Sequence, residues 1–197
     1  AKDKENPMTN VIVMYKRNGV PADKKTGMDY LIYDFANKMV EKMLTNRLEE
    51  ILQKENPPFA YTAVSSGAYF GAVHKTDALQ LVAISNPGKT DLAIETLMRE
   101  AKRVKDFGFT AGEYERAKAT YMSDLEKLNN ERDKQRSDFF VNQYVNHFLK
   151  NEPIPAIADK FATMQQMIGY IPLEAINQIS QQQFTDKNRV LAILGTE

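Results

Sequence analysis

A long helix gives way to a strand between Met43-Leu44-Thr45-Asn46-Arg47-Leu48 and Asn56-Pro57-Pro58-Phe59-Ala60-Tyr61. Before this junction, apolar residues recur at steps of three and four, which predicts an amphipathic helix over residues 26–53. The two prolines cannot continue that helix, because proline lacks an amide hydrogen and its ring clashes with the preceding turn. The β-branched and aromatic run that follows predicts a strand over residues 59–66.

The rest of the chain continues this mixture of strands and helices. Thr110 and Glu113 have the spacing of a capping box and mark one helix start, while Gly108 marks the end of the helix before it. Further strands are predicted over residues 9–16, 78–85 and 189–194, and further helices over 90–107, 111–128, 140–149, 157–168 and 172–182. This order predicts an α+β fold with two layers, in which helices cover one face of a largely antiparallel sheet. Residues 9–197 are interpreted as a single domain, and residues 1–8 as a polar extension or an end cut from a longer protein.

Composition excludes several classes of function. Lys and Arg number 26 and are balanced by 26 Asp and Glu, so no net field attracts nucleic acid or an anionic membrane. The absence of cysteine excludes disulfides, thiolate zinc sites and thiol catalysis. No apolar run is long enough to cross a bilayer. We therefore expect no nucleic-acid partner and no membrane insertion.

Short motifs along nearly the whole chain resemble the non-catalytic domains of insulinase/pitrilysin-type zinc metallopeptidases. Besides the helix–strand junction, they are Gly108-Phe109-Thr110-Ala111-Gly112-Glu113-Tyr114-Glu115-Arg116-Ala117-Lys118, Asn130-Glu131-Arg132-Asp133-Lys134, Tyr144-Val145-Asn146-His147-Phe148-Leu149, Glu152-Pro153-Ile154-Pro155 and Ile171-Pro172-Leu173-Glu174-Ala175-Ile176-Asn177. The resemblance implies the metallohydrolase fold of processing-peptidase-like proteins, in the domain that follows the catalytic one of a bacterial member. It also implies sibling domains in the same parent chain, peptide substrates, and a periplasmic or otherwise extracytoplasmic location.

The zinc motif of that family is missing. The inverted signature His-x-x-Glu-His supplies two imidazole ligands and the glutamate that activates water. The sequence holds two histidines, His74 in a predicted loop and His147 on a predicted helix, and neither has the partners. We therefore predict no catalytic residue, cofactor site or metal ligand in this chain, and expect the zinc in the catalytic domain of the parent. An approximate alignment places Gln80 and Asp91 where some members carry a substrate-gripping Arg and Tyr, which favours an inner, structural domain.

Two pairs of residues are candidates for a domain interface. Tyr30 and Tyr33 fall between the apolar positions of the first helix and are interpreted as facing a partner domain, where aromatic residues are enriched. Arg132 and Arg136, one helical turn apart, would clamp a peptide carboxylate or an acidic neighbouring domain. The alternative, which we favour for the arginines, is a solvated helix face with pairs at three- and four-residue spacing.

The sequence thus leads to two hypotheses. The first is a structural or substrate-chamber domain that positions peptides for a zinc metallopeptidase whose active site lies elsewhere in the parent. The alternative is a scaffold or interaction domain of the same fold, in a parent without peptidase activity.

Overall fold

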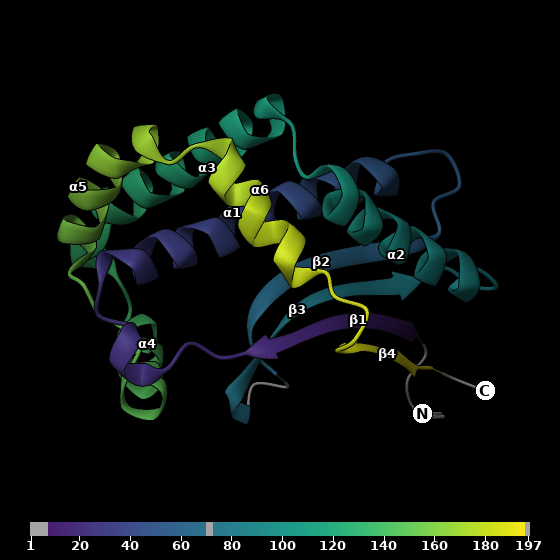
Figure 1. Cartoon of the computed structure of the whole chain (residues 1–197), viewed down its shortest axis with the longest axis horizontal. Helices are drawn as coiled ribbons and strands as arrows, with labels where there is room; N and C mark the ends of the chain where they lie inside the picture. Colours follow the sequence, from purple (N-terminus) through teal and green to yellow (C-terminus); the bar gives the residue numbers. More distant parts are fainter. Residues whose placement is uncertain (1–7, 70–72, 196–197) are drawn as a thin grey trace.

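A four-stranded antiparallel sheet forms one layer of the fold, with strand order β2-β3-β1-β4 (Figure 1). The computed structural model describes residues 8–69 and 73–195. Strands β1 and β3 are interior, and the apolar run Leu79-Gln80-Leu81-Val82-Ala83-Ile84 in β3 is typical of a central strand. The strands are β1 (Thr9–Asn18), β2 (Phe59–Tyr69), β3 (Val73–Ser85) and β4 (Arg189–Leu194).

Helices cover one face of this sheet, which confirms the predicted α+β layers (Figure 1). Helix α4 differs, because it stands at one end of the molecule beside the start of α1. No helix in the described part of the chain combines the length and apolar character that crossing a bilayer requires. The helices are α1 (Met28–Leu52), α2 (Thr90–Phe107), α3 (Ala111–Asn130), α4 (Ser137–Lys150), α5 (Ile157–Met167) and α6 (Leu173–Gln183).

The core lies between the sheet and the helices. Side chains on a strand alternate between the two faces, so Val11, Val13 and Tyr15 of β1 all point toward the helices and are buried. The opposing helices contribute side chains at steps of three and four, among them the fully buried Met39 and Met43 of α1. Met28, which the same apolar period includes, lies at the first residue of α1 and is exposed.

Two residues of the motifs quoted above, Arg47 and Glu113, form a buried ion pair between α1 and α3. The Nε of Arg47 lies 2.5 Å from Oε1 of Glu113, and its Nη2 donates to the carbonyl of Gly108 at 3.1 Å. The predicted capping box is confirmed, because Thr110 accepts from the Glu113 amide and donates its own amide to the Glu113 carboxylate. Burial opposes ionisation of Glu113, but the hydrogen bonds from Arg47 and Thr110 outweigh it and lower its pKa to about 2.

A second set of contacts ties α6 to the loop before α3. Asn177 accepts from the amide of Phe109 at 2.8 Å and donates to its carbonyl at 3.1 Å. Gly108 has a φ of 69°, and a Cβ atom there would lie 2.5 Å from the Asn177 side chain, so only glycine fits without displacement. The hydroxyl of Tyr114 donates to the carbonyl of Ile171 at 2.8 Å. These motif residues therefore hold the fold together.

The β1–β3 ladder is longer than predicted. It pairs Arg17 with Asp77 and Asn18 with Thr76, where the sequence predicted loops. Two adjacent strands satisfy each other's backbone groups, and this non-local gain outweighs the loop-like local composition. The loop predicted at His74 was therefore wrong, since β3 begins at Val73; the His74 side chain and residues 1–7 lie outside the described part. Pro172 is the N-cap of α6, where the sequence predicted the first helical residue.

Candidate functional site

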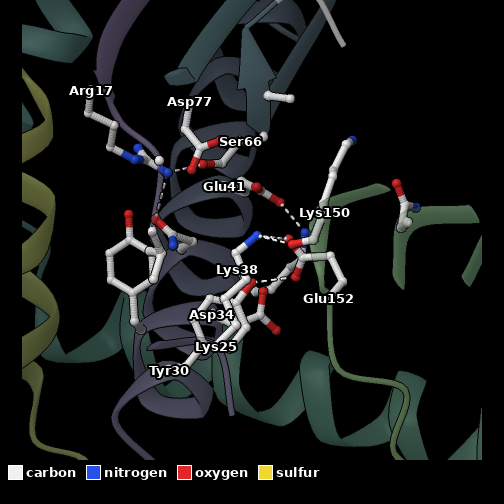
Figure 2. A pocket seen from close by; sticks show the side chains of 17 residues that line it. Arg17, Lys25, Tyr30, Asp34, Lys38, Glu41, Ser66, Asp77, Lys150 and Glu152 are labelled. Atoms are coloured by element: carbon white, nitrogen blue, oxygen red, sulfur yellow. Dashed lines mark hydrogen bonds and ion pairs between the residues drawn. The ribbon is translucent and has the colours of Figure 1, made fainter. Parts of the chain in front are cut away.

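A polar cavity of about 330 Å³ lies where the apolar core of the sheet ends (Figure 2). The helix-facing positions of β1 continue from Tyr15 to Arg17, and those of β3 run from Leu79 to Asp77. Ser66 on β2 occupies the same face. The sheet thus changes from apolar to charged within one alternation of side chains, and the cavity begins at that point.

Helix α1 supplies the second wall. The residues that line the cavity from this helix recur at three- and four-residue steps and so form one stripe beside the core-facing stripe. The stripe consists of Tyr30, Tyr33, Asp34, Asn37, Lys38 and Glu41.

The third wall is the end of α4 and the segment that follows it. Nζ of Lys25 lies 2.5 Å from Oε1 of Glu152 and donates to the carbonyl of Lys150 at 3.0 Å. The hydroxyl of Tyr30 donates to the other carboxylate oxygen of Glu152 (Figure 2). Burial and the contact with this carboxylate raise the pKa of Tyr30, so its hydroxyl stays a hydrogen-bond donor at neutral pH.

The guanidinium of Arg17 is only partly hydrogen-bonded by the described residues of the cavity. Its Nη2 donates to Oγ of Ser66 at 2.5 Å and to Oδ1 of Asn37 at 3.2 Å, and its guanidinium lies 5.9 Å from the centre of the Tyr33 ring. Its Nε and Nη1 are buried and have no hydrogen-bond partner among the described residues. Burial raises the pKa of Glu41, although Lys38 at 3.1 Å opposes that shift. The cavity is thus built for ionic and hydrogen-bonding contacts.

The described side chains of the cavity do not form a nucleophile–base pair of the kind that acyl transfer uses. Ser66 is engaged by Arg17, and no histidine among the side chains that the structure describes lines the cavity to act as its base. In the part of the chain that the structure describes, no cluster of three or more His, Asp or Glu side chains would hold a metal ion. His147 lies on α4, where its Nδ1 is 2.7 Å from the Glu152 carbonyl.

The structure brings the residues of one predicted interface pair together but not those of the other. Tyr30 and Tyr33 lie together on the cavity wall, with ring centres 6.5 Å apart. Arg132 and Arg136 do not share a helix, because α3 ends at Asn130 and Arg136 only caps α4. Arg136 is 86% exposed and lies 3.4 Å from Asp138, so the clamp geometry is not formed within this chain. A role for either pair at a domain interface stays a prediction.

Sequence reasoning missed Arg17, Asn37 and Glu41. The predicted first strand stopped one residue before Arg17, which placed that side chain in a loop. The available signal was the alternation Val11, Val13, Tyr15, which continues to Arg17 if the strand is extended.

Comparisons place this architecture among known structures. The sequence matches no protein-family profile and no curated protein. The periplasmic protease PqqL from Escherichia coli superposes with a TM-score of 0.84 and 16% identity, over 98% of this chain and 21% of that one. A protein from Yersinia pestis described as a predicted insulinase family protease superposes with a TM-score of 0.81 and 12% identity, over 100% of this chain and 41% of that one. This chain has the fold of insulinase-family protease domains.

A structure of a single domain of a zinc protease is also similar to this chain. An inactive peptidase domain from Bordetella parapertussis superposes with a TM-score of 0.64 and 14% identity, over 95% of this chain and 92% of that one. The chain therefore spans about a fifth of the E. coli protease and two-fifths of the Y. pestis one, but nearly all of this single domain.

Proposed function

We propose that this chain is a non-catalytic domain of a bacterial insulinase/pitrilysin-type zinc metallopeptidase, and that it follows the catalytic domain of the parent. The observation that carries the proposal is the combination of fold and missing motif. Nearly the whole chain superposes on a structure described as an inactive peptidase domain, and the sequence contains no His-x-x-Glu-His.

The domain acts by positioning and exclusion. Its sheet and helices, tied by the Arg47–Glu113 pair and the Asn177 contacts, form a rigid wall of the chamber that confines an extended peptide. Zinc and the general base lie in the catalytic domain of the parent. The fold of the periplasmic E. coli protease supports a periplasmic or otherwise extracytoplasmic location for that parent.

Peptide cleavage tests this function. The full-length parent, a form of it with the zinc-binding histidine pair replaced, and this chain alone are each incubated with zinc and a broad library of peptides. We expect cleavage by the full-length parent only. Zinc-dependent cleavage by this chain alone would overturn the proposal, and inactivity of all three would replace it with the scaffold function.

A further inference from the structure

Helix α4 presents most of its apolar side chains outward, whereas Phe139 and Phe140 in its first turn are partly buried. Its partly buried positions include Gln143, Asn146 and Lys150, which line cavities on the inner side of the helix. Phe148 is 87% exposed, and four further apolar residues on the same helix are between 48% and 62% exposed. The four are Val141, Tyr144, Val145 and Leu149.

After its first turn, α4 has the reverse of the usual orientation. A surface helix normally turns its apolar stripe to the core and its polar face to water. The exposed apolar residues of α4 recur at steps of three and four, so they form one continuous stripe from Val141 to Leu149. Single exposed apolar residues are common, but a contiguous exposed apolar patch on a folded domain marks an interaction surface.

Several contacts fix the C-terminal end of α4. Lys25 binds the Lys150 carbonyl, Asn151 donates to the Ala22 carbonyl at 3.0 Å, and Glu152 is held by Lys25 and Tyr30. The polar cavity behind α4 accommodates Asn146 and Lys150 on the inner side of the helix, while Asn142 and His147 are exposed. These contacts therefore fix the orientation of α4, so that its apolar stripe faces away from the rest of the domain.

We infer that the outward stripe of α4 docks against an adjoining domain of the same polypeptide, in an apolar groove of that domain; this inference rests on the proposed function. The chains from E. coli and Y. pestis extend far beyond the length of this fold, so the fold occurs beside further polypeptide. A stable interface between separate proteins takes roughly 20–30 residues a side. Five side chains on one helix fall short of that, whereas a tether raises the effective concentration to about the millimolar range, where a small interface suffices.

Hydrogen exchange in the full-length parent tests the docking. Three forms are compared: wild type, Phe148→Ser on the α4 stripe, and Phe107→Ser as the matched control. Phe107 is 81% exposed at the end of α2 and lies outside the stripe. Phe107→Ser therefore makes the same replacement of an exposed phenylalanine by serine, but away from the stripe. We expect the α4 amides to exchange about tenfold faster in Phe148→Ser than in wild type, with no change in Phe107→Ser.

Two results would overturn the docking. The first is unchanged α4 exchange in Phe148→Ser. The second is a dimer of the full-length protein in analytical ultracentrifugation that dissociates in Phe148→Ser, because the stripe would then bind a second copy. Both readouts are independent of peptide cleavage. Protected α4 amides in an inactive parent would refute the proposed function alone, and unprotected amides in an active parent would refute the docking alone.

Discussion

Replacing Glu113 by glutamine removes the negative half of the ion pair that joins α3 to α1. Glutamine keeps the size of the side chain and still reaches the Thr110 amide, but it cannot neutralise Arg47. The side chains of Arg47 and Glu113 are only 10% and 16% exposed, so water compensates the orphaned guanidinium poorly. We expect Glu113→Gln to lower the free energy of unfolding at neutral pH.

The pKa of Glu113 gives the magnitude. A value of about 2 against an ordinary 4.5 corresponds to about 3 kcal/mol of stabilisation by the ionised carboxylate. The hydrogen bonds from Thr110 supply part of this stabilisation, and solvent weakens the part that comes from Arg47. We therefore expect Glu113→Gln to lower the free energy of unfolding by about 2 kcal/mol. Because the folded pKa is lowered, the stabilisation is complete above pH 4.5 and disappears as the pH falls toward about 2.

Urea denaturation of wild type, Glu113→Gln and Glu115→Gln at about pH 7 and about pH 3 measures both effects. Glu115 lies on the same helix and pairs with Lys118 at 2.6 Å, but it is 68% exposed, so its replacement should cost less than about 0.5 kcal/mol. The difference between wild type and Glu113→Gln should shrink in acid. An equal difference at both pH values, or a loss no greater than that of Glu115→Gln, would refute this reasoning.

Three further substitutions probe packing elsewhere. Gly108→Ala should cost about 2 kcal/mol or more, because it strains a φ of 69° and drives Cβ into Asn177; an unchanged melting temperature would contradict that close contact. Phe35→Ala should cost about 3–5 kcal/mol in urea denaturation, since the ring is buried against Tyr121, and a loss below about 1 kcal/mol would mean that the site is not packed as described. Tyr30→Phe should cost about 1 kcal/mol by removing the hydrogen bond to Glu152, and thermal melts should show no shift if that bond does not form in solution.

Local sequence signals predicted much of the fold. The helix over residues 90–107 has the predicted bounds, because Gly108 ends it and the Thr110–Glu113 box starts the next helix. These signals act within a few residues of each other and need no information about distant strands. The interior position of β3 also followed from its own apolar composition.

Non-local pairing explains the parts that were missed. The extra residues of β1 and β3 become strand only because they face each other across the sheet, as Arg17 and Asp77 do. The cavity depends on this extension, since Arg17 reaches Ser66 and Asn37 only from a strand position. The polar lining of the cavity could therefore not be predicted without knowing how β1 and β3 pair.

Periodicity has a further limit, which α4 illustrates. The spacing of Tyr144, Val145, Phe148 and Leu149 correctly predicted a helix. A period of 3.6 residues shows that a helix has an apolar side but does not say what covers that side. In this chain the described residues leave it exposed, and only the arrangement of α4 beside the polar cavity reveals the difference.

The central claim is that the zinc and the active site lie outside this chain. Metal content and peptide cleavage should be measured together for the full-length parent carrying His74→Gln and His147→Gln, which removes both histidines of this chain. We expect this double variant to have the same zinc content and the same cleavage rate as the unmodified parent. Loss of zinc together with loss of cleavage, in a variant whose unfolding transition is unchanged, would contradict the claim.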